Sequence, residues 1–289
     1  MTPITSEFII NNLPHRPDDA NKGTMGTLLN ISGSYSMAGA CILSSLSALK
    51  SGVGLLKVAL PDSIYPIVAS SVYEAVFVPV LSSKNGTIDT RSLEYLLYHA
   101  KASSAVLLGC GLKCCDETVD FVREFLSECT SDILIDADGI NALAQNIDVL
   151  KTTKAKVVVT PHPKEMSRLT GLDVEYILNN REEVATNFAR EYGVIVVLKG
   201  KNTIITDGDK LYVNPTGNSG MAKGGSGDVL SGIIASLMAQ GVALLEAACV
   251  GVYIHGLAGD LAAQMFSKTS MLPRDIIECL PQIFKTIEE

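Results

Sequence analysis

The stretch that decides the fold is NSGMAKGGSGDVLSGIIASLMAQG, residues 218–241. A glycine-rich loop runs directly into an apolar segment, and this pattern predicts a buried core helix that ends at Gly241. Free backbone N–H groups and the positive end of the dipole make the start of such a helix a binding site for anions. The loop nevertheless ends in a carboxylate, Asp228, beside the place where a phosphate is expected.

Apolar strand-like runs alternate with helical patterns before this loop. Strands are expected at 26–33, 55–61, 74–80, 105–111, 132–138, 156–163 and 194–200, and a hairpin at 202–217 with its turn at 207–209. Helices are expected at 37–52, 64–72, 92–103, 116–128 and 174–193. Near-continuous apolar strands separated by helices predict an α/β fold, with a mostly parallel central sheet and helices on both faces. With no linker or repeat in sight, residues 1–289 are expected to form a single domain.

Polar and glycine residues gather where these expected strands end. In open parallel sheets, ligands bind at the carboxyl ends of the strands. The residues that point to one crevice there are Gly109, Gly111, Asp136, Asp138, His162, Lys199 and Gly200.

The composition narrows the class of partner. A net charge of −8 without a Lys/Arg cluster argues against nucleic acid. The N-terminus lacks the pattern of a secretion signal, and the polar residues within the uncharged run 229–245 favour a core helix over a membrane span. Seven cysteines without framework spacing indicate a reducing cytoplasm. A metal cluster at Cys110, Cys114 and Cys115 is not expected, because no CxxC pair or nearby histidine accompanies them.

The glycine loop does not match either common nucleotide motif. AKGGSGDV lacks the GK[ST] of a Walker A motif, and no GxGxxG follows the first strand. The backbone of GGSGD (224–228) suits a phosphoryl group, and a carboxylate beside it can take a proton from a hydroxyl that attacks phosphorus. On residues alone, Asp228 is equally well explained as a helix-capping acid.

Five motifs in order resemble the NAD(P)H-hydrate dehydratase branch of the ribokinase-like superfamily. They are NKGTMGTLLNISGS, LIDADGINAL, VVVTPHPKE, VVLKGKNTII and NPTGNSGMAKGGSGDVLSG, and together they cover nearly the whole chain. The hydroxyethylthiazole kinases resemble it only in fold and in a version of the glycine loop. A small-molecule kinase of that type is therefore the alternative.

The resemblance implies a lyase that repairs nicotinamide cofactors. Members remove water from the S-epimer of hydrated NADH or NADPH at the expense of ADP or ATP. The hydrate hydroxyl is phosphorylated and phosphate is then eliminated, because phosphate leaves more readily than hydroxide. Mg²⁺ is expected to accompany phosphoryl transfer, with ligands that cannot be named from spacing.

Roles follow from the resemblance, position by position. Asp228 matches the catalytic base. The expected nucleotide-binding residues are Lys199, Gly200, Lys201, Asn202, Thr203, Gly225, Ser226 and Gly227. The expected substrate-binding residues are Ala40, Gly111, His162, Asp136, Asp138 and Asn141, together with Asp228. Without the resemblance, loop packing explains His162, and turn or cap chemistry explains Asp136 and Asp138 equally well.

Two positions depart from the family pattern. Cys110 stands where proline is usual, and Lys164 stands where glycine is frequent. We expect neither to carry chemistry. The resemblance further implies a homotetramer, for which the apolar region 229–266 offers surplus surface, and a separate NAD(P)H-hydrate epimerase as pathway partner.

Overall fold

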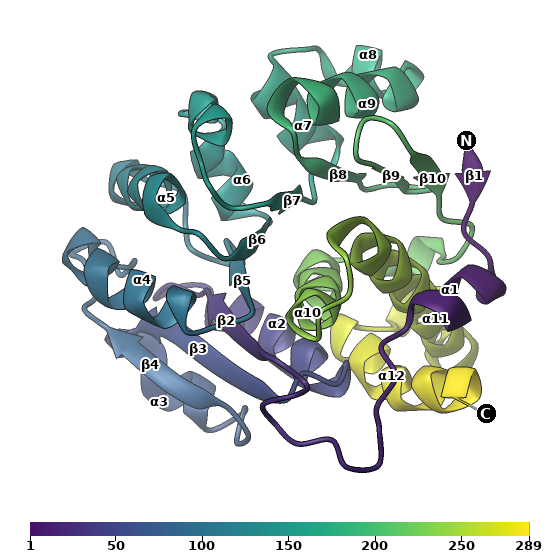
Figure 1. Ribbon diagram of the computed structural model, residues 1–289, viewed down its shortest axis with the longest axis horizontal. Coiled ribbons are helices and arrows are strands. Elements are labelled where there is room, and N and C mark those ends of the chain that lie inside the picture. Colours follow the sequence, from purple (N-terminus) through teal and green to yellow (C-terminus); the bar gives the residue numbers. More distant parts are fainter. Residues whose placement is uncertain (289) are drawn as a thin grey trace.

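The computed structural model describes residues 1–288 and is built on one ten-stranded sheet (Figure 1). The strand order is β1-β10-β9-β8-β7-β6-β5-β2-β3-β4. The bounds are β1 (Thr2–Pro3), β2 (Thr27–Ile31), β3 (Leu55–Pro61), β4 (Val76–Val80), β5 (Ala105–Leu108), β6 (Asp132–Ile135), β7 (Val157–Val159), β8 (Ile195–Leu198), β9 (Ile204–Thr206) and β10 (Leu211–Val213).

Every neighbouring pair of strands is parallel except the two pairs that involve β9. The predicted hairpin is confirmed, since β9 pairs with β10 antiparallel and Thr206 lies opposite Leu211. The mostly parallel sheet places the ends of β5 to β8 along one edge, as the sequence predicts.

Most helices come from the expected segments or from the C-terminal third, but α1, α6 and α7 are not expected from the sequence. Their bounds are α1 (Ser6–Asn12), α2 (Ala38–Lys50), α3 (Tyr65–Ala69), α4 (Leu93–Lys101), α5 (Asp116–Glu128), α6 (Asp138–Leu143), α7 (Pro163–Thr170), α8 (Val174–Asn179), α9 (Arg181–Tyr192), α10 (Ser226–Ala239), α11 (Leu244–Ser270) and α12 (Pro273–Glu288).

Helices cover both faces of the sheet (Figure 1). Successive strand residues point to opposite faces, and Val106 and Leu107 accordingly belong to two separate apolar cores. The core that contains Leu107 is formed with α2, α3, α10, α11 and α12, and the one that contains Val106 with α4 to α9. The prediction of a sheet buried on both sides is confirmed.

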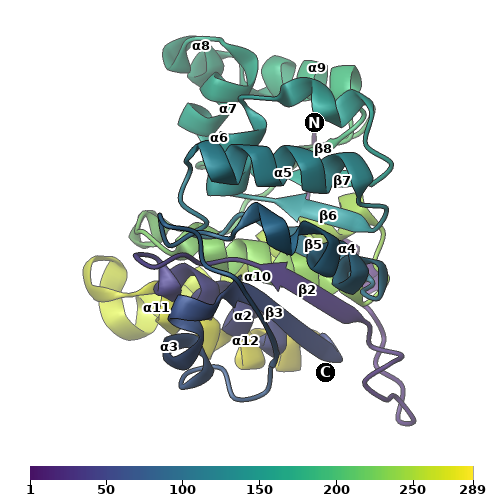
Figure 2. The same cartoon turned by 90° about the vertical axis from the view of Figure 1, so that its left-hand side faces the viewer.

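Helix α10 is the central element of the first core and passes along the sheet near β2 (Figure 2). It packs closely on α2 at Gly232, where a Cβ would lie 2.2 Å from the carbonyl oxygen of Ser44. The helix ends at Ala239, and Gly241 follows with a φ of 87°. Glycine adopts this conformation readily, which explains why the helix stops where the sequence predicts.

The expected single helix over 174–193 is wrong, because Asn180 interrupts it. Its φ and ψ are −129° and 36°, and its side-chain Nδ2 donates to the carbonyl oxygen of Tyr176. An asparagine side chain competes for backbone hydrogen bonds in this way and favours helix ends over helix interiors. The segment therefore forms α8 and α9.

Helix α11 is long and apolar enough to cross a membrane by length and composition alone. Within the molecule, 72% of its most apolar window is buried, as in the core helix of a globular protein. The side chains of α10 are largely buried as well. The apolar region 229–266 is thus mostly covered by the chain's own packing, and its large exposed apolar side chains are Met265 and Phe266 near the end of α11.

Candidate active site

The candidate site lies where β5, β6, β7 and β8 end, against the first turn of α10. Asp136, Thr160 and Lys199 each follow the end of one of these strands. Between Asp136 and Asp138, Ala137 has a φ of 50° and a ψ of −117°, which is a sparsely populated conformation for a residue with a Cβ. This turn directs the two aspartates to different partners.

Asp136 is buried and accepts hydrogen bonds from three side chains. Lys199 Nζ and Thr160 Oγ1 each lie 2.7 Å from its Oδ1, and Ser231 Oγ lies 2.7 Å from its Oδ2. Burial by itself raises the pKa of this carboxyl, but Lys199 and the hydroxyl donors outweigh it, so the pKa is lowered. Asp136 is therefore an ionised anchor, and its side chain neither caps a helix nor closes a turn.

The Lys199 side chain points away from the expected nucleotide-binding segment, residues 199–203. Its Nζ lies 2.7 Å from Asp136 and 3.7 Å from Glu165 Oε2. Burial lowers the pKa of this amine, but the two carboxylates outweigh burial and raise it. A Cβ at Gly227 would lie 3.5 Å from this Nζ. The ammonium therefore faces the glycine loop.

His162 is the N-cap of α7, and its ring orientation is set by that role. Its Nδ1 accepts from the backbone N–H groups of Lys164 and Glu165, and Glu165 Oε2 accepts from the backbone N–H of His162, which forms a capping box. Burial, followed by Lys199, lowers the pKa of the ring, so it is neutral near pH 7. With Nδ1 accepting, Nε2 carries the proton, and His162 can donate a hydrogen bond to a ligand. The capping box gives His162 a structural role, and its contact with substrate stays a prediction.

Asp228 lies in the first turn of α10 but does not cap it. The N-cap is Gly225, which has a φ of 98°. Burial, followed by the charge of Asp136, raises the pKa of the Asp228 carboxyl to about 6. Two aspartates of one site therefore differ in environment, one held ionised and one able to exchange a proton near neutral pH, which is typical of acid and base assignments in enzymes.

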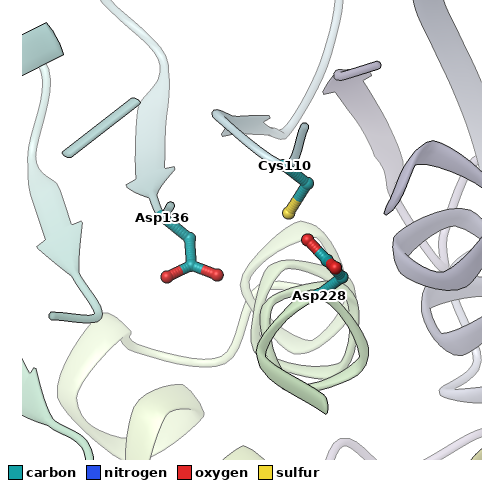
Figure 3. A group of neighbouring side chains, drawn as sticks. All are labelled: Cys110, Asp136 and Asp228. Carbon is teal, nitrogen blue, oxygen red and sulfur yellow. The ribbon is translucent and has the colours of Figure 1, made fainter. Parts of the chain in front are cut away.

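The Cys110 thiol completes a group with both aspartates (Figure 3). Its Sγ and one oxygen from each carboxylate lie within 4.8 Å of one another. Burial, followed by Asp228, raises the pKa of the thiol well above its usual value, so it stays protonated. The structure thus places Cys110 directly against the candidate base, although the sequence suggested no part for it.

Asp138 and Asn141 form hydrogen bonds with residues next to the site. Asp138 Oδ2 accepts from the backbone N–H of Lys113 at 2.8 Å, and Asn141 Oδ1 accepts from Arg168 at 2.7 Å. The Asp138 contact joins residues 25 positions apart, so it is neither the turn nor the cap considered as its alternative explanation. Ala40 and Gly111 are in contact, because a Cβ at Gly111 would lie 2.7 Å from the Ala40 Cβ. The two predicted substrate positions are therefore brought together.

The rest of the predicted nucleotide segment forms an irregular turn between β8 and β9. Gly200 has a φ of 150° and Asn202 a φ of 55°, and Thr203 Oγ1 donates to the carbonyl oxygen of Gly200. Arg181 supports the turn by donating to the carbonyl oxygens of Leu198 and Lys201. Lys201 and Asn202 also line a hollow of about 610 Å³ beside α8 and α9. The backbone of this turn is open to a ligand, whereas the Lys199 side chain turns towards α10.

Cys110, Asp136 and Asp228 have the spacing of a metal site within residues 1–288, but their chemistry does not suit Mg²⁺. Both Asp136 oxygens accept hydrogen bonds, one of them from a cation. A protonated thiol is also a poor ligand for a hard cation that prefers oxygen and water. The group is better explained by proton chemistry.

Sequence reasoning missed four residues that shape the site: Cys110, Thr160, Glu165 and Ser231. A signal existed for two of them. His162 and Glu165 have the spacing of a capping box, and Ser231 lies one helical turn after Asp228. The parts played by Cys110 and Thr160 depend on contacts between separate strands.

Comparisons with known proteins identify the family of the chain. Residues 28–282 match the family model described as NAD(P)H-hydrate dehydratase. The chain is 38% identical over 99% of its length to the bifunctional NAD(P)H-hydrate repair enzyme Nnr of Moorella thermoacetica, of which it covers 54%. It is 31% identical to the ADP-dependent (S)-NAD(P)H-hydrate dehydratase of Bacillus subtilis, with 98% of both chains covered.

The fold matches that of a solved structure over nearly the whole chain. The ADP/ATP-dependent NAD(P)H-hydrate dehydratase from B. subtilis, co-crystallised with ATP/Mg²⁺, superposes with a TM-score of 0.84 at 28% identity over 99% of both chains. The chain spans about half the length of several curated relatives that it matches. The family match over most of the chain, together with the ribokinase-like fold, shows that this chain belongs to the NAD(P)H-hydrate dehydratase family.

Proposed function

We propose that the chain catalyses the ADP- or ATP-dependent dehydration of the S-epimer of hydrated NADH and NADPH. The observation that carries the proposal is the position of Asp228. Its carboxylate lies at the start of α10, directly after the glycine loop, and burial raises its pKa to about 6. A base with a pKa near the working pH is well suited to general-base catalysis.

The first step is phosphoryl transfer. The hydroxyl oxygen of the hydrate attacks the terminal phosphorus of the nucleotide while Asp228 accepts the hydroxyl proton. The phosphoanhydride bond of the nucleotide breaks in the same step. The backbone N–H groups of Gly225 and Gly227 at the N-terminus of α10 stabilise the developing charge. Ser226 lies between them, and its own N–H already donates to the carbonyl oxygen of Lys223. The Lys199 ammonium, which faces Gly227, adds a positive charge at the same place.

The second step is elimination. The carbon–oxygen bond to phosphate breaks with assistance from the lone pair of the ring nitrogen, and the neighbouring ring carbon loses a proton to form the double bond. The sum is hydrate plus ADP giving the reduced cofactor, AMP, phosphate and one proton. His162 donates from Nε2, and we assign it to an oxygen of the substrate.

The other predicted residues are assigned to the nucleotide and the substrate. Gly200, Lys201, Asn202 and Thr203 bind the adenine nucleotide, and Ala40 and Gly111 contact the substrate with Asp138 and Asn141 at its margin. Because the cysteine–aspartate group does not suit Mg²⁺, we propose that the ion enters with the nucleotide phosphates and water. It would neutralise phosphate charge there.

The test is optical. Hydrated NADH lacks the near-ultraviolet absorbance of NADH, so its recovery with ADP or ATP and Mg²⁺, together with release of inorganic phosphate, is the expected result. Accumulation of a stable phosphorylated alcohol would instead indicate a kinase of the hydroxyethylthiazole kinase type. No nucleotide-dependent change in a folded protein would contradict both.

We also propose a cytoplasmic homotetramer that works beside a separate NAD(P)H-hydrate epimerase. All seven cysteines are free, which suits a reducing compartment. Apolar side chains are exposed on α3 and the edge strand β4 and in the segments next to them, at Tyr65, Ile67, Tyr73, Val76 and Leu81. Light scattering of the purified chain tests the assembly, and a monomer at micromolar concentration would contradict it.

A further inference from the structure

Glu165 contacts two of the predicted site residues while itself lying outside the predicted set. Its side chain is 6% exposed. Its Oε2 accepts from the His162 backbone N–H at 2.8 Å and lies 3.7 Å from Lys199 Nζ, and its Oε1 lies 3.5 Å from His162 Nε2. A carboxylate so placed influences both the histidine and the lysine.

The Lys199 ammonium group has N–H donors that form no close hydrogen bond to another described side chain. An ammonium group has three N–H donors. One donates to Asp136 Oδ1, and the 3.7 Å separation from Glu165 is an ion pair without a close hydrogen bond. On the loop side, a Cβ at Gly227 would lie 3.5 Å from the same nitrogen. The protein and a phosphoryl group on the loop therefore compete for the remaining donors.

We propose that Glu165 is a positioning residue that controls this competition: neutral Glu165 leaves the Lys199 ammonium to the phosphoryl group, and ionised Glu165 holds it towards α7. The inference rests on the proposed function, because it takes the glycine loop as the phosphoryl site. It adds a second titrating group to that site beside the base Asp228, whose pKa is about 6.

The groups around Glu165 determine its charge. Burial raises the pKa of this carboxyl to about 7, Lys199 at the end of β8 lowers it, Asp136 at the end of β6 raises it, and Arg168 of α7 lowers it. The His162 ring is neutral near pH 7. Because the pKa is close to neutrality, Glu165 is mostly protonated at pH 6 and ionised at pH 8.5. Nucleotide affinity is expected to fall over that interval.

The Glu165→Gln variant measures the effect of the Glu165 charge, because glutamine cannot ionise. Glutamine keeps the size of the side chain and also serves in a capping box, so α7 keeps its N-terminus. ADP binding is measured by calorimetry at pH 6 and pH 8.5 for wild type and variant. The ionisation of ADP itself is common to both proteins. We expect wild type to lose roughly tenfold more affinity across this interval than the variant.

A matched control is Asp173→Asn, which changes the exposed N-cap of α8, a residue that does not line the hollow at Lys201 and Asn202. Its pH dependence should equal that of wild type. A second measurement compares proton uptake in wild type and Glu165→Gln. ADP binding near pH 8, followed in two buffers of different ionisation enthalpy, should be accompanied by more proton uptake in wild type, because binding draws Lys199 away from Glu165, whereas Asp228 is common to both proteins.

The outcomes separate this inference from the proposed function. Equal pH dependence in wild type and Glu165→Gln, or equal proton uptake in the two proteins, overturns the role of Glu165 while dehydration can still be demonstrated. The expected difference in ADP binding supports the role of Glu165 whether or not hydrated NADH is turned over. Failure of wild type to bind ADP overturns both.

Discussion

Lys199 Nζ and Asp136 Oδ1 lie 2.7 Å apart and join the ends of β6 and β8. Because Thr160 and Ser231 also donate to Asp136, this carboxylate is held ionised within the protein. The second aspartate, Asp228, lies in a setting that favours its neutral form. The difference supports the proposal that Asp136 is an anchor and that Asp228 transfers the proton.

Asp228→Asn should lose turnover and gain stability. Removal of a general base costs roughly 10²–10⁴-fold in rate. The pKa of this carboxyl is about 6 in the folded protein, above its ordinary value of 3.8. Its ionisation therefore destabilises the folded state as the pH rises from the unfolded pKa to the folded pKa. The amide cannot ionise, and the variant should be more stable than wild type at pH 8 by about 2 kcal/mol. Turnover of hydrated NADH and urea unfolding measure the two effects. Activity within a few-fold of wild type would refute the assignment.

Lys199→Met should abolish most turnover, but it also leaves Asp136 unpaired and buried, at a cost of about 3–5 kcal/mol. The double variant Lys199→Met/Asp136→Asn removes both charges and should recover much of this stability. Turnover should not recover, because the positive charge beside Gly227 is still missing. Thermal melting and initial rates of both variants are compared. Restored activity in the double variant would show that Lys199 is purely structural.

Lys201→Met provides the contrast within the same segment, because Lys201 is exposed. We expect its main effect on ADP affinity, with kcat reduced far less than in Lys199→Met. Similar losses of kcat in both variants would contradict the separate placement of the two side chains.

Gly227→Ala should fold normally and bind the phosphoryl group poorly. The added methyl would meet Lys199 Nζ at 3.5 Å and Asp136 Oδ2 at 3.6 Å, which are ordinary contacts, and alanine favours the helix. It would occupy the space that the transferred group needs. Gly232→Ala is the opposite case, since its Cβ would lie 2.0 Å from Ser47 Oγ and 2.2 Å from Ser44 O. It should cost about 1–3 kcal/mol of stability. Melting curves and ADP titrations that fail to separate the two variants would contradict this assignment.

Ser231→Ala should weaken the anchoring of Asp136. A hydrogen bond to a charged group contributes about 1.5–3 kcal/mol. Because the folded pKa of Asp136 is lowered, its contribution to stability is present above the unfolded pKa and is lost as the pH falls through the folded value. Loss of a donor raises that folded pKa, so the variant should begin to unfold at a higher pH during acid titration. Circular dichroism from pH 7 to pH 2 measures this shift, and superimposable curves would show that Ser231 contributes nothing.

The sequence by itself predicted strands β2 to β10 in their order and most of the helices, but not α1, α6 or α7. The strand runs, the hairpin at 202–217 and the end of α10 near Gly241 depend on apolar periodicity and on glycine conformation. These are local properties. It also identified Asp228, His162 and the glycine loop through their resemblance to family motifs. It did not reveal the break at Asn180, where a side chain competes with the helix for hydrogen bonds.

Only the tertiary structure decided what each site residue does. Lys199 is 63 residues from Asp136 in sequence, and Ser231 is 95 residues from it. Asp136 and Asp228 are the same residue type, yet the pKa of one is lowered and that of the other is raised. Glu165 and Cys110 acquired their places in the same way. Burial and the nearness of other charges set a protonation state, and both depend on how distant strands and helices pack.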